Sequence, residues 1–344
     1  MRLAVDAHNV LVDHQGIGRY VRTLLRAFTR ESELELTLLL RRIVPWMTAR
    51  RMRRLLGSDR FALATRVPSD ADVVWHPWNG TFFDSTRPGV VTMHDAVPFA
   101  FPASDPARRS HEQEPFLRSR SARLVIAVSH IGAREIVARV GVPEERVRVI
   151  YHGVAPVFSP AEEETGGRYL LFVGKPAQPL KNFALLHRAY VRAWPDGDGP
   201  ELVVIGGDAA GYAKVRVAPL IREGGAAEAD ERMRDLYRGA LALCVPSRFE
   251  SFGMPVLEAM ACGTPVLAAR TGALPEIAAD AALLLDVDDE AAWAAAIRAI
   301  AGDGALRARL RAAGLRRARG FRWERCAAQT LEVFREAIGA PAPT

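Results

Sequence analysis

The chain has few cysteines, no long apolar run and no leader-like start. Its three cysteines, Cys244, Cys262 and Cys326, lie far apart in mostly apolar stretches, which predicts reduced core thiols and argues against a disulfide framework or a cysteine metal site. No apolar run approaches the about 20 residues of a membrane span. The opening MRLAVDAHNV enters a strand-like segment directly and lacks a signal-peptide cleavage pattern. We therefore expect a cytoplasmic protein.

Lysine is also scarce. Lys175, Lys181 and Lys214 are the only lysines, although lysine and arginine together number 46. The net charge of +6 and the isoelectric point of about 9.6 allow acidic partners. An arginine bias is typical of GC-rich genomes, and no basic motif interleaved with aromatic residues is present, so we expect no nucleic-acid partner. Positions that kept a lysine stand out, because lysine is a compact point charge.

Strand-like and helix-like segments alternate along the chain. The length of 344 residues, with 49% hydrophobic and 25% charged residues, is typical of a soluble globular protein with two domains. Such alternation predicts an α/β fold whose parallel sheets carry helices on both faces. The strand-like runs of the first half are Leu3–Ala7, Leu36–Leu40, Phe61–Val67, Val73–His76, Val90–His94, Leu124–Val128 and Val147–Tyr151.

A second alternating set follows a segment rich in Pro and Glu, Val154–Thr165, which we interpret as an interdomain linker. We predict an N-terminal domain over 1–155, a C-terminal domain over 166–320 and a terminal amphipathic helix within 321–344. The strand-like runs of the second half are Tyr169–Gly174, Leu202–Gly206, Ala242–Pro246, Val266–Ala269 and Leu283–Asp286. Each half resembles a doubly wound, Rossmann-like domain.

The segment Ser247–Pro265 reads SRFESFGMPVLEAMACGTP and holds two carboxylates eight positions apart, Glu250 and Glu258. The first is predicted on a loop and the second about one turn into a helix that Gly263 ends. Two such glutamates often belong to a solvated helix face, but here Glu258 is the only charged residue between 251 and 269. The start of this predicted helix would form an anion site, at which the backbone amides of Ser251, Phe252, Gly253 and Met254 could contact a ligand.

This segment resembles the E-x7-E signature of the retaining GT-B glycosyltransferases of family 4 (glycosyl transferases group 1). The resemblance extends from QGIGRY to FRWERCAAQTLEVFREA, which is nearly the whole chain. It implies two Rossmann-like domains facing a central cleft, with the acceptor on the first, the nucleotide-sugar on the second and the terminal helix crossing back to the first. It further implies that Glu258 holds the ribose hydroxyls and Glu250 the sugar hydroxyls, without metal or cofactor.

Two segments of the first half are similar to family site segments. Gly16 and Gly18 follow the first strand in a predicted glycine turn; a lone glycine pair can be a plain turn, but the family loop lies beside the donor phosphates. His94 ends a strand in VVTMHDAVP, and the similar family histidine contacts the donor sugar. A lone histidine is often structural, whereas the resemblance favours a catalytic role. Asp95 is expected to cap or brace the loop.

Two lysines fall within seven residues after the first strand of the second half. A solvated face is the simple interpretation of Lys175 and Lys181, and a clamp on a departing diphosphate is the functional one. The family places Arg or Lys at both positions, although Leu180 replaces an arginine that the family often has. Gly206 resembles the family's glycine turn near the nucleotide, and the region 221–230 departs from the family, which leaves the base open.

Three other motifs invite a functional interpretation. Asp286-Val287-Asp288 matches a metal-binding D-x-D motif, but it ends a strand before a helix, so Asp288 or Asp289 is predicted to be an N-cap. The run His111–Glu114 lacks the second histidine of a zinc motif and is predicted to be helix surface. The segment Arg41–Arg60, with seven arginines, is either a helix with a solvated basic face or a peripheral contact with an anionic membrane at the inner face of the plasma membrane.

The sequence therefore predicts a metal-independent, retaining hexosyltransferase. Its partners would be a nucleotide-sugar donor, with GDP-mannose the first candidate before UDP- and dTDP-sugars, and an acceptor hydroxyl on a glycan, a lipid-linked saccharide or a natural product. His94, Glu250 and Lys181 are the predicted catalytic residues. A nucleotide-sugar epimerase, a phosphorylase and a binding protein without turnover remain alternatives; a phosphorylase would need a lysine for pyridoxal phosphate, and only Lys214 is spare.

Overall fold

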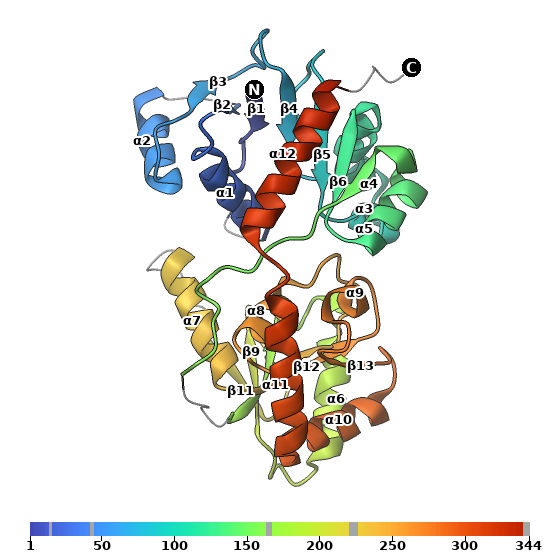
Figure 1. Cartoon of the computed structure of the whole chain (residues 1–344). Helices are drawn as coiled ribbons and strands as arrows, with labels where there is room; N and C mark the ends of the chain where they lie inside the picture. Colours follow the sequence, from blue (N-terminus) through green and yellow to red (C-terminus); the bar gives the residue numbers. More distant parts are fainter. Residues whose placement is uncertain (14–15, 42–44, 163–166, 220–225, 340–344) are drawn as a thin grey trace. The chain divides into compact units, whose positions relative to one another are not determined.

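The chain folds into two α/β units, each built on one parallel sheet (Figure 1). The computed structural model describes residues 1–13, 16–41, 45–162, 167–219 and 226–339. Unit 1 comprises Met1–Gly153 together with the segment that begins at Trp323, and unit 2 comprises Val154–Arg322. The α/β class and the Rossmann-like halves predicted from the sequence are confirmed.

The sheet of unit 1 has the strand order β3-β2-β1-β4-β5-β6-β7, and every pairing is parallel. The order reverses between β1 and β4, where a doubly wound fold opens a crevice at the carboxyl ends of its strands. The strands are β1 (Arg2–Asp6), β2 (Glu35–Leu39), β3 (Ala62–Ala64), β4 (Val73–His76), β5 (Gly89–Met93), β6 (Leu124–Ala127) and β7 (Val147–Val149). The helices are α1 (Gly16–Phe28), α2 (Pro45–Leu56), α3 (Val97–Ala100), α4 (Pro106–Arg118), α5 (His130–Glu135) and α12 (Trp323–Gly339).

The last helix completes the core of unit 1. Helix α12 packs against α1 and against strands β4, β5 and β6. The rings of Phe28, Trp75 and Phe334 meet there, with centroids 5.6 to 5.9 Å apart. All three side chains are buried, so residues more than 300 positions apart along the chain share one apolar core.

The sheet of unit 2 has the order β10-β9-β8-β11-β12-β13, again all parallel, with its reversal between β8 and β11. The strands are β8 (Tyr169–Val173), β9 (Glu201–Ile205), β10 (Val215–Ala218), β11 (Ala240–Val245), β12 (Val266–Ala269) and β13 (Leu283–Leu285). The helices are α6 (Phe183–Ala193), α7 (Ala226–Arg238), α8 (Met254–Ala261), α9 (Leu274–Ala278), α10 (Glu290–Gly302) and α11 (Gly304–Ala318).

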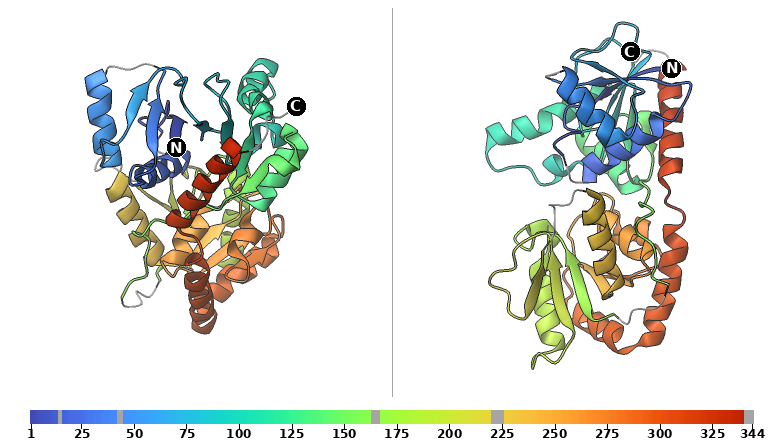
Figure 2. Two further views of the ribbon diagram at one scale, coloured as in Figure 1. Left: turned by 45° about the horizontal axis from the view of Figure 1, so that its top comes forward. Right: turned by 90° about the vertical axis from the view of Figure 1, so that its left-hand side faces the viewer.

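Helices cover both faces of the second sheet. Helix α6 packs against α10, whereas α8 packs against α7 and α11. Because the strand order reverses between β8 and β11, right-handed crossovers place these two groups on opposite faces. Figure 2 shows helices on both sides of the strands of this unit.

Two local predictions were wrong. The predicted glycine turn around Gly16 and Gly18 is the first turn of helix α1. The helix begins this early because the Gly18 amide donates to the carboxylate of Asp13 (3.1 Å), which caps the first turn. Strand β10 was not predicted, because it is a partly exposed edge strand of four residues with a weak apolar pattern. The family-divergent region, the linker and the basic segment each include residues outside the described ones, namely 221–225, 163–165 and 42–44.

Candidate functional site

The loops that follow β8 and β11 bring Lys181 and Glu250 together at the switch point of unit 2. Lys181 Nζ donates to Glu250 Oε1 at 2.6 Å, and Ser247 Oγ donates to the same oxygen at 2.7 Å. Both charged side chains are mostly buried, with 24% and 15% of their surfaces exposed, so solvent screens the pair only in part. One carboxylate oxygen therefore holds the ammonium group in place.

The lysine loop is fixed by backbone contacts with the carboxyl end of β11. The Leu180 carbonyl accepts from the Arg248 amide at 2.8 Å, and Asn182 Nδ2 donates to the Pro246 carbonyl at 3.2 Å. Asn182 adopts a left-handed conformation with φ of 50°. Lys181 therefore lies between two anchored neighbours.

The loop after β12 forms hydrogen bonds with the loop after β11 that carries Glu250. Thr271 Oγ1 donates to the Ser247 carbonyl at 2.6 Å, and the Ala273 amide donates to the Glu250 carbonyl at 2.8 Å. Gly272, with φ of 51°, lies so close that a Cβ there would overlap the backbone of Glu250. Only glycine therefore fits this position.

Glu258 lies in α8, one turn after the loop, as predicted. Its side chain is buried, and Oε2 accepts the hydroxyl hydrogen of Tyr237 in α7 at 2.9 Å. The helix starts after Gly253, whose φ is 93°, and its chain reverses at Gly263, whose φ is 78°. A carboxylate is thus held about one turn into an eight-residue helix.

The remaining predicted residues of unit 2 lie on neighbouring loops. Lys175 is exposed, and a Cβ at Gly207 would overlap its backbone, so the loops after β8 and β9 touch. Gly206 has φ of 102°, which favours glycine. Asp289 is the N-cap of α10, since its side chain accepts from the Ala292 amide at 2.9 Å, and Asp288 instead pairs with Arg248.

His94 of unit 1 lies just after β5 and is buried and uncharged. Its Nε2 faces the Pro77 carbonyl at 2.9 Å, and since a carbonyl only accepts, Nε2 carries the hydrogen. Burial lowers the pKa of His94 to about 4, against weaker opposing effects of the Pro77 carbonyl and Asp13. His94 therefore presents a neutral imidazole whose Nδ1 is a hydrogen-bond acceptor.

An aromatic cluster surrounds His94. The rings of Tyr20 and His152 lie 4.8 and 5.4 Å from it, and Trp323 stacks on His152 at 5.7 Å. Burial lowers the pKa of His152 well below its ordinary value, with a smaller contribution from His94. These partners were missed because nothing in the local sequence joins residues 20, 152 and 323.

Asp95 braces the loop after β5, as expected. Its Oδ1 accepts from the Val97 amide at 3.0 Å and its Oδ2 accepts from Asn79 Nδ2 at 3.2 Å. The Asn79 side chain also accepts from the His94 amide. Burial raises the pKa of Asp95, while these hydrogen bonds partly oppose the rise. Asp95 and Asn79 therefore hold the backbone of His94 in place.

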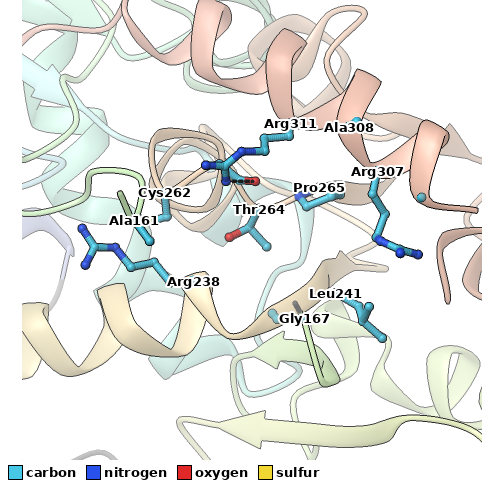
Figure 3. A pocket seen from close by; sticks show the side chains of 13 residues that line it. Ala161, Gly167, Arg238, Leu241, Cys262, Thr264, Pro265, Arg307, Ala308 and Arg311 are labelled. Carbon is cyan, nitrogen blue, oxygen red and sulfur yellow. Dashed lines mark hydrogen bonds between the residues drawn. The ribbon is translucent and has the colours of Figure 1, made fainter. Parts of the chain in front are cut away.

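A cavity of about 240 Å³ lies elsewhere in unit 2, beside the amino ends of β8, β11 and β12 (Figure 3). Three arginines surround it, and each donates to backbone carbonyls: Arg311 to Gly263, Arg307 to Ile300 and Ala301, and Arg238 to Ser159 and Pro160. The first two stabilise the carboxyl ends of α8 and α10. This cavity is therefore remote from Lys181 and Glu250, which follow the carboxyl ends of the strands.

The basic segment forms helix α2 with a solvated face. Met52 and Leu56 are buried, while Arg50, Arg51, Arg53 and Arg54 are exposed. Among the helices in the described part of the chain, none is long and apolar enough to cross a membrane.

Two family models match the chain, one in each unit. The model described as Glycosyltransferase Family 4 matches residues 21–158, and the model described as Glycosyl transferases group 1 matches residues 167–303.

Curated relatives are glycosyltransferases. The chain is 29% identical over 312 residues to the O-antigen chain mannosyltransferase B of Escherichia coli, covering 82% of this chain and 78% of that protein. It is 30% identical over 332 residues to the D-inositol 3-phosphate glycosyltransferase 1 of Catenulispora acidiphila, covering 83% and 77%. Of two further inositol 3-phosphate glycosyltransferases it spans 54% and 63%.

A solved structure shares the fold over the whole chain. Anabaena HepE in complex with UDP-glucose matches with a TM-score of 0.71 at 14% identity, covering 98% of this chain and 100% of that one. Identity at this level supports the shared fold alone.

Proposed function

Since the chain belongs to the glycosyltransferases of family 4 (glycosyl transferases group 1) and has their GT-B type of fold, we propose that it moves a hexosyl group from a nucleotide-sugar to an acceptor hydroxyl with retention of configuration. The observation that carries the proposal is the Lys181–Glu250 pair beside the start of α8. A cation and a carboxylate at a switch point match a ligand with both phosphates and hydroxyls.

Lys181 would stabilise the departing diphosphate. An ammonium group has three donors, and Glu250 uses one of them, so the others can meet phosphate oxygens. Because Lys181 is already held in place, little reorganisation is needed as negative charge develops. Lys175 and the amides at the start of α8 would add positive potential at the same end of the sheet.

The two glutamates would hold hydroxyl groups. Glu250 Oε1 is engaged by Lys181 and Ser247, so its Oε2 is the oxygen offered to a sugar hydroxyl. Glu258, oriented by Tyr237, would accept from the ribose. The neutral His94 would accept a hydroxyl of the transferred sugar through Nδ1, since its Nε2–H is used by Pro77. With these roles, the proposed reaction would need no metal ion.

GDP-mannose is the donor we propose first, ahead of UDP- and dTDP-sugars. The HDAVP segment and the likeness to an O-antigen mannosyltransferase support mannose, whereas the fold is shared with a protein that binds UDP-glucose. The acceptor would be a glycan, a lipid-linked saccharide or a natural product. We also propose a cytoplasmic location, with any peripheral contact with anionic membranes made mainly by the exposed arginines of α2, because Met52 and Leu56 of that helix are buried, although Met47 is exposed.

Thermal unfolding with GDP, UDP, ADP, dTDP and CDP tests the donor site. A nucleotide at ~100 times its Kd should stabilise the protein by about 2.7 kcal/mol, and we expect GDP to give the largest rise in Tm. The Glu258→Ala variant should weaken nucleotide binding, and Lys181→Ala should mainly slow transfer. Lys214→Ala is the matched control, since Lys214 donates to the Pro195 carbonyl away from this loop.

Two results would contradict the proposal. If none of the five nucleotides raises Tm, the site around Lys181 and Glu258 does not bind donors. If the Lys181 and Glu258 variants behave like the Lys214 variant in both binding and transfer, the assignment of these residues is wrong.

A further inference from the structure

A second polar cluster lies at the switch point of unit 1. Asp6 ends β1, His8 follows it by two residues, and His76 ends the neighbouring strand β4. This is the position in a doubly wound sheet where ligands bind. None of the site residues discussed above belongs to this cluster.

Asp6 holds His8 in one tautomer. The Asp6 side chain is fully buried, and its Oδ1 lies 2.6 Å from His8 Nδ1 and accepts from the His8 amide at 3.2 Å. Burial by itself raises the pKa of Asp6, but the imidazoles of His76 and His8, which face the carboxyl group, together outweigh burial, so the pKa is lowered and the group is a carboxylate. Since a carboxylate only accepts, His8 Nδ1 carries the hydrogen, and in the neutral imidazole Nε2 is then the acceptor.

Aromatic rings flank His8. Trp78 and Phe82 lie with their ring centroids 5.8 and 4.9 Å from the imidazole, and Arg41 lies over Phe82 at 5.8 Å. The Trp78 side chain is held in place by a hydrogen bond, because its Nε1 donates to the Asp6 carbonyl at 2.7 Å. One polar nitrogen between apolar ring faces suits a saccharide, which combines hydroxyl groups with apolar C–H faces.

The cluster also contains two buried polar atoms that form no hydrogen bond with the described residues. Asp6 Oδ2 and His76 Nδ1 face each other at 3.7 Å, beyond hydrogen-bond distance, and neither atom has a hydrogen-bond partner among the described residues. Burying polar atoms without a hydrogen bond costs stability. In the described ranges no group of three or more His, Cys, Asp or Glu side chains is placed to hold a metal ion, which argues against a metal site here.

We propose that His8 binds the saccharide acceptor, with Nε2 accepting the hydrogen bond of an acceptor hydroxyl and Asp6 positioning the imidazole. The proposal rests on the proposed function, because it assigns the acceptor side of that reaction. His8 is a binding residue and Asp6 a positioning residue. The ligand class is a saccharide or polyol that stacks on Phe82, which is partly exposed, whereas Trp78 is buried.

NMR of the protein with ¹⁵N-labelled histidine tests this assignment. The probes are the methyl glycosides of mannose, glucose, galactose and N-acetylglucosamine, together with myo-inositol. We expect at least one of them to move the Nε2 resonance of His8. His8→Ala should raise its Kd about tenfold, the usual effect of one lost hydrogen bond, and His8→Gln should restore part of the affinity. His111→Gln, on the exposed side of α4, is the control that should not change binding.

Asp6→Asn separates positioning from folding. The Asn amide can donate to Nδ1, which would move the hydrogen to Nε2 and remove the acceptor. The ¹⁵N spectrum should show this tautomer change, and binding of the probe should fall as in His8→Ala. A folded Asp6→Asn protein that changes tautomer but binds the probe normally would overturn the proposal.

The experiments distinguish a wrong acceptor assignment from a wrong donor site. If a nucleotide raises Tm but no probe moves the His8 resonance, the acceptor assignment is wrong and the donor site stands. If a probe moves it and no nucleotide binds, unit 1 binds saccharides but the proposed donor site is wrong.

Discussion

The imidazole of His94 shows how burial decides what a single residue can do. It touches Tyr20 and His152, both of which are buried, and the charge of Asp13 opposes the effect of burial on its pKa only weakly. With a pKa of about 4 it stays neutral throughout the physiological range. It can accept a hydrogen bond at neutral pH but cannot act there as a cation.

The stability of the protein should therefore depend on the protonation of His94. Its folded pKa lies below the ordinary value of 6.5, so the unfolded state binds the proton first and stability falls as the pH drops from 6.5 toward 4. The difference corresponds to about 3 kcal/mol for this one group. Urea unfolding of the wild type and of His94→Gln at pH 7 and pH 4.5 measures it.

The wild type should lose more stability than the variant over this range. His111→Gln is the control, since an exposed histidine should leave the slope unchanged. Equal slopes for the wild type and His94→Gln would mean that His94 is protonated normally in the folded state.

At the residue scale, the sequence was a better guide to the candidate site residues than to the contacts between them. Glu250 was assigned from its spacing to Glu258, and Lys181 from the scarcity of lysine and the family resemblance, but their ion pair joins two loops 69 positions apart. Tyr237 and Thr271 have no motif of their own. The Asp6-Ala7-His8 run did offer a signal, since it follows the first strand, but its meaning depends on His76, which comes from another strand.

At the element scale, the start of helix α1 depends on the close approach of Gly18 to the backbone of Asp13. A Cβ at Gly18 would overlap the Asp13 carbonyl oxygen, while a Cβ at Gly16 would meet nothing within 4 Å. The lack of a side chain is therefore required by the contact at Gly18, whereas no such contact requires it at Gly16 among the described residues.

Alanine substitutions should separate the two glycines. Gly18→Ala should lower the free energy of unfolding by about 1–3 kcal/mol, because the capping loop at Asp13 must shift. Gly16→Ala should be neutral or stabilising by up to about 1 kcal/mol, because alanine lowers the entropy of the unfolded chain. Urea midpoints compare them. If Gly16→Ala is the more damaging of the two, the glycine at position 16 is needed for a close approach that the structure does not contain.

Most elements could be predicted because buried parallel strands are short apolar runs. Strand β10 and helix α11 were missed for opposite reasons. The strand is partly exposed, and the helix carries so many arginines that its apolar stripe is weak. Most strand boundaries moved by one or two residues, as at β1 and β5, and the end of β3 moved by three.

At the scale of the whole molecule, the chain leaves unit 1 at residue 153 and returns to it at residue 323. Helix α12 supplies Phe334 to the core around Trp75 and Phe28. The amphipathic pattern predicted this helix, but only the folded chain shows which aromatic rings it meets.

One substitution on α12 should test how much unit 1 depends on it. Phe334→Ala should cost about 3–5 kcal/mol, the usual effect of emptying a buried aromatic site. Ile338→Ala, one turn further and 41% exposed, should change stability by no more than about 0.5 kcal/mol. Hydrogen exchange should locate the loss in β4, β5 and α1. Loss confined to unit 2 would contradict the assignment of α12 to the core of unit 1.

The return of the chain to unit 1 sets an order of events on the ribosome. Translation adds about 5–20 residues per second, so roughly 10 to 30 seconds pass between the synthesis of residue 153 and that of Trp323, where the second segment of unit 1 begins. During that time the apolar surfaces of Phe28 and Trp75 lack their partner. Unit 2 is continuous, so it can complete its fold first, and the nascent first segment is the part of the protein that a chaperone would have to shield from aggregation.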